Sequence, residues 1–186
     1  MANIGPAHMI NMETDSVGPW LVGIDIAHHQ IHEGEMFQVV AASTDLDAGD
    51  CLGIIVHTAT GYYPHFTYEV SASGAGHVSL YKAPNISASH SRGTLLTKNN
   101  VDQNSSKTSH TTVRSVASVL ATPGTLLERY FIGGGGTRGA GAGESRSGSE
   151  WILYAVAATH YYVEFKSSAA NSDGTVTARW YEEGAD

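Results

Sequence analysis

Four segments of this chain alternate between apolar and polar residues, and this period of two constrains the fold more than any other feature. In one of them, Phe66, Tyr68 and Val70 share a face, while in another Tyr162 and Glu164 fall on the polar face. Such alternation predicts strands with one face buried and one face wet. The four segments are 63-YPHFTYEVSA-72, 75-AGHVSLYKAP-84, 159-THYYVEFKSS-168 and 174-GTVTARWYEE-183.

Further strands are predicted where apolar residues cluster between turn signals, at 35–43, 51–57, 125–132 and 150–156. The composition supports this, because 21 glycines and only 15% charged residues do not favour helices. Two long polar or glycine-rich loops are expected at 84–111 and 133–149. About eight strands without a helix predict an all-β fold, an antiparallel β-sandwich in the form of a jelly roll.

The domain organisation predicted from the same signals is one sandwich preceded by an arm. Residues 1 to about 19 show no period and contain Gly5, Pro6, Gly18 and Pro19, which is typical of an extended segment. We therefore expect an N-terminal arm and lead-in at 1–33 and a jelly-roll domain at 34–186.

Charge and cysteine content exclude several classes of function. The formal net charge of -8 argues against a nucleic acid or an anionic membrane as a partner. The N-terminus lacks the regions of a signal peptide, and no apolar stretch is long enough to cross a bilayer, so we expect a protein made and kept in a cytoplasm. The single cysteine, Cys51, lies in an apolar run and is expected to be a small buried residue.

The segment 27-AHHQIHEGE-35 is the strongest candidate for a metal site. His28 and His32 have the spacing of the two histidines of a zinc helix, but that motif requires Glu directly after the first histidine. We expect a strand instead, with His29 and Glu33 on the opposite face, and with Ile31 and Phe37 anchored in the core. The cluster then predicts hydrogen-bonded or interfacial histidines and no metal.

No catalytic constellation or cofactor site is predicted. The run 133-GGGG-136 has neither the following helix nor the lysine of a phosphate-binding loop, although Arg138 and Arg146 could order it against a neighbouring subunit. Paired carboxylates such as Glu182 and Glu183 fall where a solvated strand edge is expected. We therefore expect a protein that is not an enzyme.

Several landmarks follow one another over most of the chain. They are 28-HHQIHEGEMF-37, 64-PHFTYEVSASGAGHVSLYKAP-84, 98-KNNVDQNSS-106, 124-GTLLERYFIGG-134, 143-GESRSGSEWIL-153 and 161-YYVEFKSSAANSDGTVTARWYEE-183. Their order and spacing resemble a family of tailed-bacteriophage virion proteins, described as head-decoration (cement) or minor structural proteins. One departure is 154-YAVAATHYY-162, which lacks the proline-containing turn expected before the penultimate strand.

The resemblance implies a jelly-roll protein that forms homotrimers and binds the major capsid protein. It would be made in the cytoplasm of the host bacterium and would stabilise the head from the outer surface of the virion. We expect residues 1–33 to make these contacts, and the loops 85–110 and 133–149 to lie together at one end of the barrel. The interface residues expected are His28, His29, His32, Glu33, Arg138 and Arg146.

Two other functions remain open at this point. A head- or tail-fibre module could bind host glycans through exposed Tyr62, Tyr63, Trp151 or Trp180, because jelly rolls carry many functions. A metal-dependent jelly-roll enzyme could instead be built on 28-HHQIH-32.

Overall fold

A computed structural model describes the chain at 10–15, 18–23, 26–83, 93–120, 122–133, 144–147, 150–153 and 159–184. Side chains are described from residue 26 onward within these ranges, except at 144–147. Arg138, residues 84–92 of the first long loop and most of the segment 154–162 lie outside the described residues.

The described residues form strands and one short helix, α1 (Ile26–His32). The eight predicted strand positions are confirmed, although the strand expected at 150–156 is seen only at Trp151–Ile152. The strands are β1 (Ile10–Asp15), β2 (Gly18–Gly23), β3 (Phe37–Leu46), β4 (Cys51–His57), β5 (Tyr62–Ala72), β6 (Gly76–Lys82), β7 (Thr94–Leu95), β8 (Asn99–Asn100), β9 (Thr112–Val116), β10 (Thr125–Ile132), β11 (Glu144–Ser147), β12 (Trp151–Ile152), β13 (His160–Ser167) and β14 (Ser172–Gly184).

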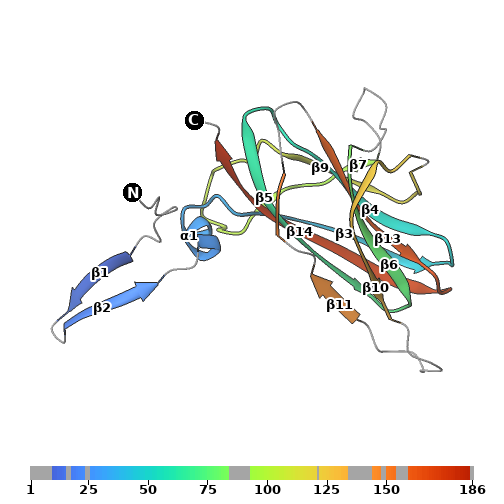
Figure 1. The fold of residues 1–186 in the computed structure, drawn as a ribbon, viewed down its shortest axis with the longest axis horizontal. Helices are drawn as coiled ribbons and strands as arrows, with labels where there is room; N and C mark the ends of the chain where they lie inside the picture. The colour runs from blue at the N-terminus through green and yellow to red at the C-terminus, as the bar shows by residue number, and fades with distance from the viewer. Residues whose placement is uncertain are drawn as a thin grey trace, which may run out of the picture.

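The long strands form two antiparallel sheets that pack face to face (Figure 1). One sheet has the order β10-β6-β13-β4-β9-β7, and the other has the order β11-β5-β14-β3-β8, with β12 also paired to β5. Successive strands from β3 to β6 alternate between the sheets, so each sheet is built from segments that are distant in sequence. The predicted antiparallel β-sandwich is therefore confirmed.

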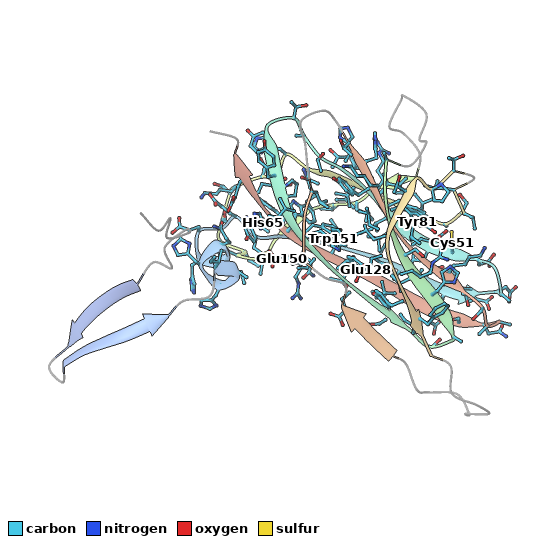
Figure 2. All side chains as sticks on the ribbon, viewed as in Figure 1. Cys51, His65, Tyr81, Glu128, Glu150 and Trp151 are labelled. Carbon is cyan, nitrogen blue, oxygen red and sulfur yellow. The ribbon has the colours of Figure 1, made fainter. Side chains whose placement is uncertain are left out.

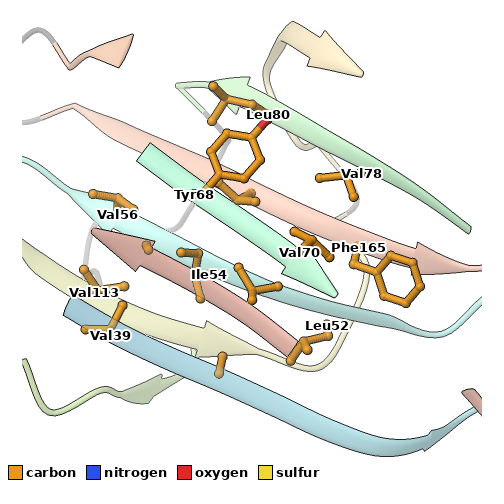
Figure 3. Packing of buried hydrophobic residues seen from close by; sticks show 14 of the residues in the cluster. Val39, Leu52, Ile54, Val56, Tyr68, Val70, Val78, Leu80, Val113 and Phe165 are labelled. Carbon is orange, nitrogen blue, oxygen red and sulfur yellow. The ribbon is translucent and has the colours of Figure 1, made fainter. Parts of the chain in front are cut away.

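The core lies between the sheets, where side chains fill the interior (Figure 2). Each strand contributes alternate residues, as the period of two predicts. Figure 3 shows the packing of Ile54 and Val56 from β4 against Val39 and Val70 of the opposite sheet. Trp180 of β14 is the largest of the fully buried side chains.

The predicted strand at His28–Glu33 is wrong, because residues 26–32 form helix α1. Gly34 ends this helix in a left-handed conformation with a φ of 68°. Its amide bonds to the carbonyl of Ile31 at 2.9 Å, and the next amide bonds to that of Gln30 at 2.9 Å, which is a Schellman cap. A Cβ on Gly34 would also lie 2.2 Å from Ser105 Oγ, so glycine is required twice over.

One smaller prediction about the N-terminal region is also wrong. None of the residues of α1 is buried, so Ile31 does not anchor the segment in the core, whereas Phe37 is buried as predicted. Part of the N-terminal segment expected to be an arm forms a β-hairpin, in which β1 and β2 pair from Ile10↔Gly23 to Asp15↔Gly18.

The outer face of the β6–β13–β4 region was predicted to be exposed to solvent, and this prediction is wrong. Tyr162 and Glu164 of β13 are buried together with Tyr81 of β6 and Ile55 of β4. The connection from β9 to β10 explains this, because those strands lie on opposite sides of the β4–β13–β6 group and the chain must cross the sheet between them. Leu120, in this connection, packs into the same cluster and is only 3% exposed.

Three polar side chains, those of Cys51, Tyr162 and Glu164, contact one another beside the cluster that contains Leu120. The hydroxyl of Tyr162 donates to Glu164 Oε1 at 3.2 Å and lies 3.9 Å from the Cys51 thiol. Burial raises the pKa of Glu164 above its ordinary value, although Tyr162, Lys166 and Arg129 act in the opposite direction. Burial also raises the pKa of Cys51 to about 11, which makes this thiol a poor nucleophile, as predicted for a small buried residue.

Candidate functional site at one end of the sandwich

One end of the sandwich gathers histidines from several segments that are far apart in sequence. We call this surface the histidine end and define it by His28, His32, His65 and His110. The start of β5 and the end of β14 lie here, because Tyr63 pairs with Glu183, and the loop 98–111 joins them through the pairing of Phe37 with Asn100. The C-terminal end of β14 marks this end in Figure 1.

The Glu182 carboxylate holds the loop 98–111 onto β14. Its Oε1 accepts hydrogen bonds from the Ser109 hydroxyl at 2.5 Å, from the Thr111 amide at 2.7 Å and from Trp180 Nε1 at 3.3 Å. Its Oε2 accepts from the His110 amide at 2.8 Å and contacts His110 Nδ1 at 3.2 Å. The prediction that Glu182 lies on a solvated edge is therefore wrong, since its side chain is only 6% exposed.

Two opposing effects act on the pKa of Glu182. Burial raises it, but the hydrogen bonds from Ser109, Thr111 and the His110 amide outweigh burial, and the pKa lies below its ordinary value. The ammonium of Lys98 closes the loop from the other side, donating to the Ser109 carbonyl at 2.5 Å and to the Thr111 carbonyl at 3.0 Å. The loop is thus fixed by charge-assisted hydrogen bonds to a carboxylate, Glu182, and from an ammonium group, Lys98.

This anchoring presents His110 to the outside. Its ring stacks on Tyr62 with a centroid distance of 3.8 Å and an interplanar angle of 13°. The His110 side chain is 51% exposed although its backbone amide is bound to Glu182. The geometry therefore fixes the orientation of a ring that remains available for contact.

His65 lies between two carboxylates on the outer face of the same end. Its Nδ1 is 3.3 Å from Glu150 Oε1, and its Nε2 is 3.6 Å from Glu183 Oε2. The ring stacks on Tyr181 at a centroid distance of 4.4 Å. Figure 2 shows His65 and Glu150 beside each other, far from Cys51 and Tyr81. His65, which belongs to β5, thereby links the residue that precedes β12 to β14.

Helix α1 places His28 and His32 on one exposed face, with their Nε2 atoms 3.0 Å apart. His29 is half-buried and Glu33 is exposed. The loop 98–111 fixes the end of the helix, because Asn100 and Ser105 donate to the Gly34 carbonyl at 2.6 and 3.1 Å.

The structure does not bring all of the predicted interface residues together. His28, His29, His32 and Glu33 lie in or beside α1, whereas Arg146 lies on β11 opposite Val70, some way along β5 from the histidine end.

The prediction that both long loops share one end is wrong for the described residues. The loop 98–111 lies at the Tyr62 end of β5, but Gly133 lies beside Ala75 and Glu144 pairs with Ala72 at the other end. The order of the strands decides this, and it cannot be read from loop composition.

The aromatic residues expected to bind glycans are only partly exposed. Trp180 has no exposed surface, and its Nε1 donates to Ser109 Oγ at 2.9 Å. Trp151 is half-buried against the core, where its Nε1 donates to Glu128 Oε2 at 3.2 Å. The prediction of an exposed Trp180 is therefore wrong.

Sequence reasoning missed His65, His110 and Glu182 as parts of one site. Each lies in a different segment, and only the strand pairing brings them together. A weak signal was present: Ser109-His110-Thr111 offers two hydroxyls and consecutive amides, a combination that suits a buried carboxylate.

Within the described part of the chain, no group of three or more His, Cys, Asp or Glu side chains is arranged to hold a metal ion. Among those same residues, no helix has the length and apolar character needed to span a membrane.

The fold and this surface define an all-β sandwich protein with a histidine-rich end and a preceding hairpin. Comparisons of the chain with models of protein families, with curated proteins and with solved structures gave no match. Its function must therefore be argued from its own residues.

Proposed function

We propose that this chain is a non-enzymatic structural protein of a tailed-phage virion. In this proposal it binds the outer surface of the icosahedral head as a decoration (cement) protein, contacts the major capsid protein and forms homotrimers. The ordered sequence landmarks suggest this class, and the structural feature that best supports it is the N-terminal hairpin.

The hairpin supports the proposal because, among the described residues, its two strands form a sheet of their own. Among the described residues, β1 pairs only with β2, in a sheet of two strands. An isolated two-stranded hairpin is marginally stable in water, since it buries little apolar surface. Contact with a capsid or with a neighbouring copy would supply that burial, as expected for an arm that orders on binding.

The histidine end supports the same role, because the chain passes from the hairpin into the sandwich through α1 at this end. The anchored loop 98–111 gives the surface a fixed shape, and His110, Tyr62 and the exposed face of α1 provide polar and aromatic contacts. Such surfaces suit protein–protein contact.

An apolar edge strand supports self-association. β10 lies at the edge of its sheet and exposes Phe131 by 71% and Leu126 by 46%. Exposed apolar residues on an edge strand favour contact with another chain. A symmetric trimer would cover such edges and would match the local three-fold points of a capsid.

The jelly-roll form of the sandwich belongs to this proposal as well. A jelly roll is one long antiparallel hairpin of eight strands wrapped into two sheets. In such a hairpin the first strand pairs with the eighth, the second with the seventh, the third with the sixth and the fourth with the fifth. The eight strands here would be β3, β4, β5, β6, β10, β11, β13 and β14. The pairs β3–β14, β4–β13, β5–β11 and β6–β10 are all present.

The proposal is tested by adding purified protein to phage heads that lack decoration and measuring occupancy by cosedimentation and electron microscopy. The expected result is saturable binding in hundreds of copies, lost on deletion of residues 2–23. A control is Ser168→Ala, because Ser168 is exposed and follows β13 at the opposite end of the sandwich, beside Gly76. Failure of the full chain to bind heads would refute the cement role. Unchanged occupancy after the deletion would refute the role of the arm.

A further inference from the structure

Helix α1 brings two imidazole nitrogens to the distance that a shared metal ion requires. His28 Nε2 and His32 Nε2 are 3.0 Å apart on an exposed face, and the ring centroids are 4.6 Å apart in an edge-to-face arrangement. Two nitrogens bound to one Zn²⁺ at about 2.0–2.1 Å would be separated by about 2.8–3.4 Å for bond angles between the octahedral and tetrahedral values. The observed separation lies within that range.

We propose that His28 and His32 form a two-nitrogen chelating site for a divalent transition metal ion such as Zn²⁺, Ni²⁺ or Cu²⁺. Imidazole suits these ions, and histidines four apart on a helix form the usual pair of a zinc helix. The expectation of no metal rested partly on placing these histidines on a strand, and the helix removes that part of the reasoning. Among the described residues, no group of three or more His, Cys, Asp or Glu could hold the ion, so the site proposed is a two-histidine site with water at the other coordination positions.

A metal ion would take the place of the proton that the two Nε2 atoms share. Without metal, the 3.0 Å contact is a hydrogen bond in which one Nε2 donates to the other. A metal needs both Nε2 lone pairs, so the donating ring must move its proton to Nδ1 or release it. Both rings are exposed, and the net charge of -8 favours the approach of cations.

Metal binding would also stabilise the helix. An isolated helix shorter than about 12 residues is marginal in water, and α1 has only 7 residues. A metal that joins residues one turn apart acts as a cross-link across the helix and reduces its fraying. Because α1 connects the hairpin to the sandwich, the metal would stiffen the base of the arm. This last consequence rests on the proposed function, whereas the metal site does not.

Titration calorimetry of the full chain with Zn²⁺ and with Ni²⁺ at neutral pH tests the site. We expect His28→Ala and His32→Ala each to weaken binding at least about tenfold, the smallest loss found even for outer-shell partners of a metal. His29→Ala in the same helix is the control and should leave the affinity unchanged. Alanine favours helices, so circular dichroism should show the same fold in all variants.

Hydrogen exchange provides a second readout. The amides of Glu33, Gly34 and Glu35 bond to carbonyls of α1, so Zn²⁺ should slow their exchange in the natural chain but not in His28→Ala. Equal affinity in the natural chain and a His28→Ala/His32→Ala double variant would overturn the proposal, as would no binding at millimolar metal. Failure to bind phage heads would refute only the cement role, because neither measurement here involves a capsid.

Discussion

Glu182→Gln is the substitution that most directly tests how the histidine end is held together. The change keeps the size of the side chain but leaves one acceptor oxygen where the carboxylate has two. Oε1 accepts from Ser109 and Thr111, and Oε2 accepts from the His110 amide. In either orientation, the new NH₂ group faces at least one backbone N–H, which loses its acceptor.

The magnitude follows from the hydrogen bonds. A buried donor left without an acceptor costs about 1–3 kcal/mol, and bonds that lose their charged partner each weaken by about 1 kcal/mol. We therefore expect Glu182→Gln to lower the free energy of unfolding by about 2–4 kcal/mol. For a chain of this length, this corresponds to a fall in Tm of about 5–15 °C.

The assay is urea unfolding followed by tryptophan fluorescence, because Trp180 contacts the same carboxylate. The folded pKa of Glu182 is lowered, so its stabilisation is complete above the unfolded value of about 4.3 and is lost as the pH falls through the folded value. The difference between the natural chain and the variant should therefore shrink in acid. Glu183→Gln, whose side chain is 59% exposed, is the matched control. Equal stability of the two variants at neutral pH would refute the reasoning.

Two further predictions concern the outer face of β13. Burial raises the folded pKa of Glu164, so its ionisation opposes folding as the pH rises above the unfolded value. Glu164→Gln should then be more stable than the natural chain at pH 8 and equal to it in strong acid, and urea titrations at both pH values would show this. A Cβ on Gly53 would lie 2.6 Å from Tyr162 Cε2 and 2.9 Å from the Val163 carbonyl. Gly53→Ala should lower the free energy of unfolding by about 1–3 kcal/mol, whereas the control Gly184→Ala should leave it unchanged. An equal effect of the two substitutions would contradict the prediction, because it would mean that the sheet relaxes around the added methyl group.

The strands could be predicted because their signal is local. Side chains alternate across a sheet, so Phe66, Tyr68 and Val70 identify a buried face without knowledge of any partner strand. A cluster of apolar residues between turn signals, which is also a local pattern, located β10 at Thr125–Ile132, as predicted. It failed at Tyr162 and Glu164, because alternation shows which residues share a face and does not show whether another segment covers that face.

Helix α1 shows where local sequence patterns fail to predict the secondary structure. A segment of seven residues has too little local preference to decide between a helix and a strand. The tertiary structure decided it, through the left-handed Gly34 and the loop residues Asn100 and Ser105 that bond to its carbonyl. These contacts join residues about seventy positions apart, so no local pattern contains them.

The sequence by itself thus determined an acidic, strand-rich sandwich, because the period of two and the turn residues act within a few positions along the chain. The histidine end was decided only by the tertiary structure. Strand pairing brings His65 between Glu150 and Glu183, and it brings His110 onto Glu182 and Tyr62. Burial and hydrogen bonding depend on which distant segments meet, and that choice belongs to the packing of the whole chain.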